Sequence, residues 1–210
     1  MSDPRRTEAG PAIEIGPDCA LLIVDLQVDF CPGGALAVPA GDEVVGPINR
    51  IIDRFPFVIA SRDHHPEDHC SFAHRGGPWP SHCVRGTPGV ELHPDLRREH
   101  VDLLIDKATT PGQECYSAFG ERDLAAELRS RSIRHLFVGG LATDYCVQAS
   151  VLDALAAGFA VTLLLDCTRA VNARPTPAFE PGDGERAIRR MVDAGAVAVS
   201  SRALGVWRQA

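Results

Sequence analysis

The chain has 210 residues, 45% of them hydrophobic, and a formal net charge of -7. A chain of this length and composition can bury one good-sized core, which predicts a single domain. The negative charge argues against nucleic acid or an anionic membrane as the main partner, because neither would be attracted to this surface. We therefore expect a small-molecule or protein partner.

The N-terminal stretch and the cysteines indicate where the protein works. Residues 1–17 are polar and lack an apolar signal-like segment, and no run in the chain approaches 18 apolar residues. The seven cysteines are an odd number without a CxxC pair, so they predict neither a disulfide framework nor a cysteine-only zinc site. We expect a flexible N-terminal tail (1–17), one domain (18–210) and a cytoplasmic location.

Short apolar runs alternate with amphipathic segments along the chain. The apolar runs predict six strands, at 19–24, 57–60, 101–105, 135–140, 160–165 and 196–200, and the segments between them predict helices at 42–52, 121–131, 143–157 and 183–194. Strands without polar alternation are typical of parallel sheets covered on both faces. The sequence therefore predicts an α/β fold, a doubly wound three-layer α/β/α domain with a six-stranded, mostly parallel sheet.

Four reactive side chains follow four successive predicted strands. Asp25, Asp63, Lys107 and Cys146 come after the first, second, third and fourth strand, respectively. In doubly wound sheets ligands bind outside the carboxyl ends of the strands. Each of these residues alone could be a surface charge, a helix cap or a buried small hydrophobe. The repetition favours a shared site at one edge of the sheet.

Three of these residues form a chemically coherent set. Cys146 falls in the first turn of a predicted helix, where the helix dipole favours a thiolate and so suits a nucleophile. A carboxylate such as Asp25 can take the thiol proton and later give it to a leaving amine. Lys107 would hold the negative charges close together. The set contains no histidine, so it differs from the Cys–His pair of papain-like proteases.

A histidine-rich stretch follows the second predicted strand. Five of the eight histidines lie between positions 64 and 82. Aspartate and histidine side chains suit Zn, Fe or Mn, and a set of two or three with open positions describes a catalytic metal site. We predict Asp63, His65 and His82 as ligands, with His69 as a candidate fourth. The simpler interpretation is a solvated loop with polar histidines.

Five blocks of sequence, in order along the chain, carry a family resemblance. They are 24–34 (VDLQVDFCPGG), 61–66 (SRDHHP), 79–87 (WPSHCVRGT), Lys107 with 116–119 (YSAF), and 140–146 (GLATDYC). Together they resemble the nicotinamidases, also called pyrazinamidases, of the isochorismatase-like cysteine hydrolases. The acid, lysine and cysteine blocks belong to the whole superfamily. The two blocks with the predicted metal ligands are similar to the nicotinamidase branch.

The resemblance implies a reaction and a role for each residue. Cys146 would attack the carboxamide of nicotinamide after losing its proton to Asp25. The N–H groups of Ala142 and Cys146 would bind the oxyanion, with a cis peptide between Leu141 and Ala142. Nicotinate and ammonia would be the products, feeding NAD salvage, and pyrazinamide would be a second substrate. One divalent metal ion per chain, Zn in first place and Fe or Mn as alternatives, would orient the ring.

The resemblance also implies a substrate pocket and contains departures. Phe30, Trp79, Tyr116 and Leu141 would contact the ring; ordinary core packing is the alternative for the aromatic residues. The departures are at four positions, each holding a residue unlike the usual one of the family: Val28, His64, Ala108 and Cys115. None replaces a predicted catalytic residue or metal ligand. His64 adjoins the predicted ligands and could alter the metal shell.

Two other functions remain open at this point. A related cysteine amidohydrolase could act on a ureido or carbamoyl substrate, although such relatives generally lack the histidine-rich metal block. Isochorismatase activity is disfavoured because that reaction does not depend on the cysteine. A non-catalytic metal- or ligand-binding protein on the same fold would bind metal without turnover. The resemblance leaves both a monomer and a homo-oligomer open.

Overall fold

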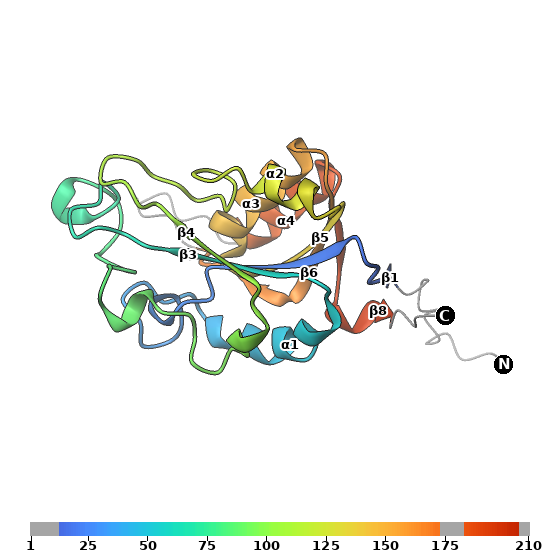
Figure 1. Ribbon diagram of the computed structural model, residues 1–210. Coiled ribbons are helices and arrows are strands. Elements are labelled where there is room, and N and C mark those ends of the chain that lie inside the picture. The colour runs from blue at the N-terminus through green and yellow to red at the C-terminus, as the bar shows by residue number, and fades with distance from the viewer. Residues whose placement is uncertain (1–12, 173–182, 206–210) are drawn as a thin grey trace.

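The computed structural model describes residues 13–172 and 183–205. Its centre is a six-stranded sheet in the order β4-β3-β2-β5-β6-β7, with every neighbouring pair parallel (Figure 1). The strands are β2 (Cys19–Val24), β3 (Val58–Asp63), β4 (Leu103–Lys107), β5 (His135–Leu141), β6 (Ala160–Arg169) and β7 (Val197–Val199). The predicted six-stranded parallel sheet is confirmed.

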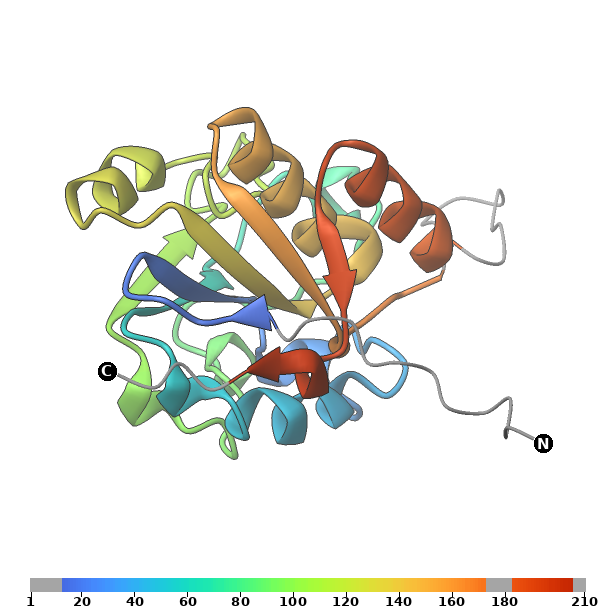
Figure 2. The same cartoon turned by 90° about the vertical axis from the view of Figure 1, so that its right-hand side faces the viewer.

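Helices cover both faces of the sheet. Helix α1 (Val45–Asn49) lies on one face, and α2 (Leu124–Ser130), α3 (Gln148–Ala156) and α4 (Asp183–Asp193) lie on the other (Figure 2). The protein therefore has the three layers that the sequence predicts. Among the described residues, no helix is both long and apolar enough to cross a membrane.

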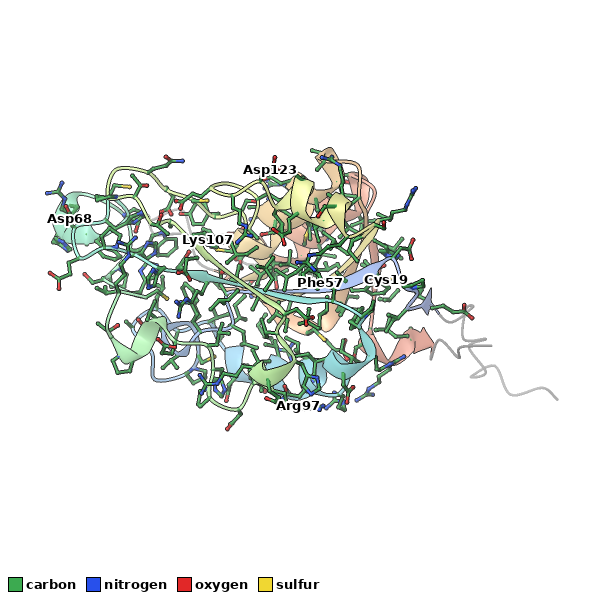
Figure 3. All side chains as sticks on the ribbon, viewed as in Figure 1. Cys19, Phe57, Asp68, Arg97, Lys107 and Asp123 are labelled. Atoms are coloured by element: carbon green, nitrogen blue, oxygen red, sulfur yellow. The ribbon has the colours of Figure 1, made fainter. Side chains whose placement is uncertain are left out.

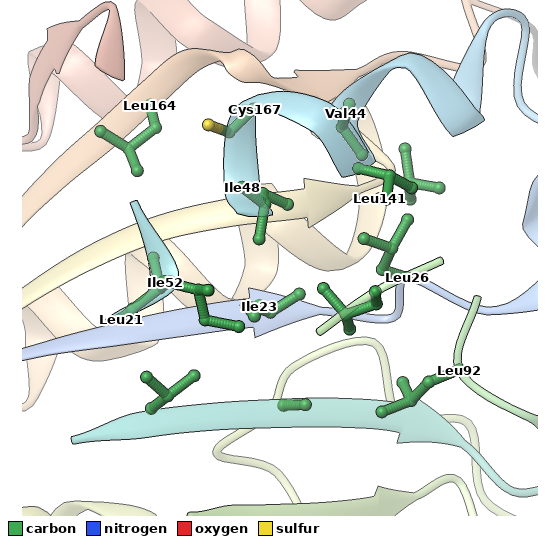
Figure 4. Close-up of a cluster of buried hydrophobic side chains, with 14 of the residues drawn as sticks. Leu21, Ile23, Leu26, Val44, Ile48, Ile52, Leu92, Leu141, Leu164 and Cys167 are labelled. Carbon is green, nitrogen blue, oxygen red and sulfur yellow. The ribbon is translucent and has the colours of Figure 1, made fainter. Parts of the chain in front are cut away.

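The central strand β2 shows how one apolar run builds two cores. Its six residues are all buried, and alternate side chains point to opposite faces. Leu21 and Ile23 join the cluster on the α1 face, which Figure 4 shows in close-up, while Leu22 joins the cluster beneath α2, α3 and α4 (Figure 4). The lack of polar alternation in this run follows from burial on both sides.

The predicted helix at 42–52 is three short pieces. A 3-10 turn (Gly41–Val44), α1, and a second 3-10 turn (Ile52–Arg54) follow one another. Pro47 has no N–H to donate to the preceding turn, and Ile51 leaves helical geometry at φ -120°. The prediction of one continuous helix was wrong, although Val45, Ile48 and their neighbours do face the core as expected.

The N-terminal boundary also differs from the prediction. Strand β1 (Ile13–Glu14) pairs in parallel with β8 (Leu204–Gly205), away from the carboxyl edge of the main sheet (Figure 1), and Ile15 is buried. A flexible tail through residue 17 is therefore wrong for these residues, because the backbone pairing and the Ile15 side chain tie them to the domain. Residues 1–12 of the predicted tail lie outside the described part of the chain.

The segment after β5 begins as a π-helix (Thr143–Val147) and continues as α3, so the predicted helix at 143–157 is divided at residue 148. The long stretch between β3 and β4, which is described throughout, contains no α-helix and no further strand of the main sheet; it has 3-10 turns at Ala73–Arg75, Pro88–Val90 and Arg98–His100 and isolated β-bridges. Two further 3-10 turns are Val28–Phe30 and Ser201–Ala203. The irregular loops after β2 and β3 gather at the carboxyl edge of the sheet.

Candidate active site

The four reactive side chains singled out by the sequence do meet at the carboxyl edge. Asp25 directly follows β2, Asp63 and Lys107 are the last residues of β3 and β4, and Cys146 lies in the π-helix after β5. In the register of β3 and β4, Asp63 stands opposite Lys107. One ligand atom of each of Asp25, Asp63 and Cys146 falls within 4.8 Å of those of the other two.

Lys107 is the only lysine in the sequence, and it is 1% exposed. Its Nζ lies 2.9 Å from Asp25 Oδ2, donates to Asp63 Oδ1 and to the Cys115 carbonyl (3.1 Å), and lies 3.6 Å from Cys146 Sγ. Figure 3 labels this side chain (Figure 3). One buried ammonium therefore bridges both carboxylates and the thiol.

The charges of this group are mutually dependent. Burial alone would lower the pKa of Lys107, but Asp25 and Asp63 raise it well above its ordinary value. Burial alone would raise the pKa of Asp63, but Lys107 and His65 hold it well below its ordinary value. Lys107 is therefore charged and Asp63 ionised at neutral pH, an arrangement that is stable in a buried site only when the partners are all present.

Asp25 has the properties of a proton acceptor. Its backbone lies in the left-handed region at φ 45°, its N–H donates to the Ser61 carbonyl (3.1 Å), and its Oδ1 accepts from Ser61 Oγ (2.7 Å). Burial raises the pKa of Asp25 against the opposing ammonium of Lys107, and the Asp63 charge adds to the rise. A carboxylate with a raised pKa is a stronger base than an exposed one.

The burial of Cys146 favours the thiol over the thiolate, which opposes the effect of its helical position and agrees with the predicted role of Asp25 as its base. Burial raises the pKa of this thiol well above its ordinary value; Lys107 opposes the rise, and the charges of Asp25 and Asp63 add to it. Desolvation disfavours the charged form more than the first turn of a helix favours it. The nucleophile therefore needs a base beside it, and Asp25 occupies that place.

Asp63, His65 and His82 form the predicted metal group. Their ligand atoms all lie within 4.8 Å of one another, and all three side chains are buried. The backbone brings them together, because His65 forms a parallel bridge with Val84 and donates its N–H to the Cys83 carbonyl (3.0 Å). This pairing sets His65 beside His82, with ring centroids 4.8 Å apart.

Both histidines direct Nε2 to the centre of this group. His65 Nδ1 lies 3.2 Å from the Ala108 carbonyl and His82 Nδ1 lies 2.8 Å from the Pro80 carbonyl, so each Nδ1 is placed to donate to a carbonyl and each Nε2 is left to face a metal ion. Burial lowers the pKa of His82 to about 4, which keeps it neutral. His65 Nε2 is buried, 3.5 Å from Asp63 Oδ2, and has no hydrogen-bond partner among the described residues. Two imidazoles and a carboxylate fit a divalent transition metal.

His69, the candidate fourth ligand, does not belong to this group. Its Nδ1 accepts from the Ser71 N–H (3.3 Å), and its Nε2 lies 3.0 Å from the Gln113 carbonyl, so both ring nitrogens are occupied. These contacts therefore do not support His69 as a fourth ligand. His64 lies outside the shell as well, because its Nδ1 lies 3.5 Å from Asp106.

Gln27 supports the site, a role that the sequence analysis did not assign. It is fully buried. Its Nε2 donates to the carbonyls of Asp63 and Val90 (both 2.8 Å), and its Oε1 accepts from the Asp63 N–H (2.8 Å). The side chain therefore fixes the backbone of Asp63 from a position two residues after Asp25. The available signal was the alternation of polar Asp25, Gln27 and Asp29 with apolar residues directly after an apolar strand.

A pocket of about 450 Å³, counting the space at its mouth, opens above Cys146. Of the residues predicted to contact the ring, Phe30, Trp79 and Tyr116 line it, as do Ala142, predicted for the oxyanion hole, and the predicted metal ligands Asp63 and His82. Trp79 Nε1 donates to Tyr116 Oη (3.2 Å), which fixes one aromatic wall. The size and the mixture of aromatic and polar side chains are typical of a small-molecule site.

Other lining residues were not predicted, and one prediction was wrong. The structure adds Leu36, Val38, Glu114, Tyr145 and Val171 to the pocket wall. Leu141 does not line it: its side chain packs in the core cluster near Val44, as the close-up shows (Figure 4). Leu141 and Ala142 are adjacent, but the chain turns between them, so only Ala142 faces the pocket. The peptide joining them is cis, as the resemblance implied.

The departure at Ala108 has a backbone consequence. Ala108 has φ 52°, a conformation that favours glycine, and its carbonyl is the one that faces His65 Nδ1. Alanine therefore carries a conformational cost at a position that orients a predicted metal ligand. The substitution leaves the histidine contact in place.

Comparison with known proteins shows which family shares this architecture. A model of the isochorismatase domain matches residues 19–203. The chain belongs to the isochorismatase family. Nicotinamidase of Escherichia coli (strain K12) is 43% identical, over 86% of this chain and 93% of that protein. The resemblance inferred from the sequence blocks is confirmed.

Solved structures of this family share the fold. The pyrazinamidase of Pyrococcus horikoshii in complex with zinc is 45% identical, with a TM-score of 0.79, and covers 88% of this chain and 99% of its own. A structure of PnC1 from L. infantum in complex with nicotinate is 37% identical, with a TM-score of 0.85, and covers 92% and 98%. Both similarities cover most of this chain.

Proposed function

We propose that this isochorismatase-family protein is a nicotinamidase, which hydrolyses nicotinamide to nicotinate and ammonia. The observation that carries the proposal is the position of Asp63. This one carboxylate joins the cysteine–aspartate–lysine group through Lys107 and the histidine pair through His65, beside a single aromatic pocket. Relatives and solved structures with nicotinamidase and pyrazinamidase activity in their names support the same reaction.

The first half of the reaction forms a thioester. Asp25 takes the proton of the Cys146 thiol, and the sulfur attacks the carboxamide carbon while the C=O electron pair moves to oxygen. The N–H groups of Ala142 and Cys146 would bind this oxyanion. Collapse of the intermediate breaks the C–N bond, and Asp25 returns its proton to the leaving ammonia.

The second half regenerates the enzyme. Water loses a proton to Asp25 and attacks the thioester carbon, and the C–S bond breaks to give the carboxylic acid, which loses its remaining proton to solvent and leaves as the carboxylate. Cys146 leaves as a thiolate beside the ammonium of Lys107 and recovers a proton from Asp25. Lys107 keeps its charge throughout, because Asp25 and Asp63 raise its pKa well above its ordinary value.

Asp63, His65 and His82 would hold one divalent metal ion, for which the neighbour with zinc supports Zn, with Fe and Mn as alternatives. When bound, the ion supplies a Lewis acid for a ring nitrogen of the substrate. His82 also packs against Phe30, with ring centroids 5.6 Å apart. The metal group thus adjoins the aromatic wall, so a flat heteroaromatic amide such as nicotinamide or pyrazinamide suits the pocket.

A reaction on ureido or carbamoyl substrates is the second candidate, since the cysteine group alone would support it. Buried histidine nitrogens facing an aromatic pocket favour the nicotinamidase, because an aliphatic carbamoyl group uses neither. A protein that binds metal without turnover would not need a base and an ammonium against a buried thiol. The site therefore favours catalysis.

Ammonia release from nicotinamide, benzamide and an N-carbamoyl amino acid tests the proposal. Benzamide has the same ring size and amide but no ring nitrogen, so it is the matched control for recognition by the metal group. We expect release from nicotinamide far above release from the other two. Faster release from the carbamoyl compound would favour the second candidate. Equal rates of release from nicotinamide and benzamide would show that the metal group does not position the substrate.

The proposed cellular role is salvage of nicotinamide for NAD synthesis in the cytoplasm. All seven cysteines are free, and Cys31 and Cys167 have pKa values raised by burial to about 11 and about 12. Thiols in this state suit a reducing compartment and leave Cys146 as the cysteine with a base at hand.

A further inference from the structure

The proposed reaction changes the charge of the bound molecule. Nicotinamide enters as a neutral amide, and nicotinate leaves as an anion. A pocket that binds both equally well would retain its product. The charged residues around the pocket therefore bear on product release as well as on substrate binding.

The charged side chains that line the pocket are both acidic. They are Asp63, whose charge a bound metal ion would offset, and Glu114, at the mouth. No arginine or lysine lines the pocket within the described part of the chain. Lys107 lies beneath it, 1% exposed, with its charge already matched by two carboxylates.

The carboxylate of Glu114 is held at this position by its own loop. Glu114 is exposed, and its Oε1 accepts from the Cys115 N–H (3.0 Å). The loop is fixed in turn, because the Gln113 carbonyl accepts from His69 Nε2 (3.0 Å) and the Pro111 carbonyl accepts from the Cys70 N–H (2.7 Å). His69, which lies outside the candidate metal group, thus holds the loop that carries Glu114.

We propose that Glu114 is a specificity-determining residue that disfavours an anionic ligand in the pocket and so promotes release of the carboxylate product. This inference rests on the proposed function. Glu114 takes no part in the bond-making, bond-breaking or proton-transfer steps of the proposed reaction. It acts through its charge, which repels a carboxylate bound above Cys146 and has little effect on a neutral amide.

The size of the effect follows from a solvent-exposed charge pair. At separations of about 6–8 Å and an effective dielectric constant of about 60, close to that of water, the repulsion corresponds to about a three- to fivefold weaker binding of the anion. Because the Debye length is about 8 Å at physiological ionic strength and about 3 Å at 1 M, high salt should remove most of the difference.

The test compares the affinities of nicotinate and nicotinamide in Glu114→Gln. Calorimetry on metal-loaded protein with Cys146→Ala prevents turnover, so both ligands can be measured in the same background. Glu99→Gln is the matched control: it changes the same charge, its side chain is 67% exposed, and it precedes the amino end of β4, across the sheet from the pocket. The readout is the ratio of the nicotinate dissociation constant to that of nicotinamide.

We expect this ratio to fall about three- to fivefold in Glu114→Gln at low salt, to stay within about 1.5-fold in Glu99→Gln, and to converge at 1 M salt. An unchanged ratio in Glu114→Gln, or an equal change in the control, would overturn the inference. Weaker binding of nicotinamide alone would also overturn it, since Glu114 would then bind the amide directly. If the wild type releases no ammonia from nicotinamide, the proposed function fails instead.

Discussion

Replacing Lys107 by methionine removes the one cation among three acidic groups and keeps the length of the side chain. In the wild type its Nζ lies 2.9 Å from Asp25 and 3.6 Å from Cys146 Sγ, and it pairs with Asp63. Asp25 and Asp63 are 0% and 5% exposed. The variant therefore leaves two buried carboxyls without their counter-ion.

Removing one partner of a buried ion pair typically costs about 3–5 kcal/mol, because the remaining charge must be buried alone or neutralised. We expect a loss of this size in the free energy of unfolding of Lys107→Met at pH 7. A domain stable by about 5–15 kcal/mol can tolerate it and remain folded. Turnover should fall to background, since the thiol and both carboxyls would bind protons.

The loss should depend on pH. Without the ammonium, burial would hold the pKa of both carboxyls above the value of about 3.9 in an unfolded chain, so the folded variant would bind more protons than the unfolded one. Its stability should therefore fall as pH rises from 5 to 8. The wild type gains from Asp63, whose lowered pKa adds stability above about pH 4 that is lost only as pH falls. The difference between the two proteins should widen with pH.

Urea unfolding at pH 5, 7 and 8 measures this difference. Arg189→Met is the matched control, because Arg189 has a side chain 63% exposed and pairs with Glu185 on the surface of α4. It should cost less than about 1 kcal/mol at every pH. A loss below about 1 kcal/mol in Lys107→Met, or a loss that does not change with pH, would refute the bridging role of this lysine.

Three further predictions concern the site. Asp25→Asn and Cys146→Ala should each lower kcat on the order of 10³-fold, and the double variant should lose no more than the worse single variant; additive losses would show that the two do not act together. His82→Ala should lose bound metal after dialysis, whereas His69→Asn should keep about one ion per chain, as measured by elemental analysis. Loss of metal from His69→Asn would show that His69 is a ligand after all. Ala108→Gly should raise the free energy of unfolding in urea by about 0.5–1 kcal/mol, because glycine relieves the left-handed backbone at the expense of some unfolded-state entropy; a decrease would show that φ 52° carries no cost.

Much of the fold could be predicted because strands that are buried on both faces appear in the sequence as continuous apolar runs without polar alternation. β2 and β5 are such runs, and the parallel sheet follows from the helices between them. Ligands bind at the carboxyl ends of parallel strands, so the sequence also predicted that Asp25, Asp63 and Lys107 lie at one edge of the sheet. The break in the helix at 42–52 was missed because Ile48 and Ile52 keep a helical spacing on either side of a backbone kink.

The site was harder to predict where chemistry alone does not decide. His69 and His82 are equally good ligands by residue type, and only the contacts of His69 with Ser71 and Gln113 exclude it. Leu141 stands next to Ala142 in the sequence, yet faces the core. The position of Cys146 in a first helical turn indicates a thiolate, but its burial opposes that charge. Tertiary hydrogen bonds and desolvation are invisible in a single sequence.

The central claim is that one site needs both the thiol and the metal group to hydrolyse nicotinamide. Ammonia release by the wild type and by Cys146→Ala, each as purified, after chelation and after metal is added back, tests it most directly. We predict release by the metal-loaded wild type alone, lost on chelation and restored by metal. Release by Cys146→Ala, or undiminished release after complete removal of metal, would contradict the account.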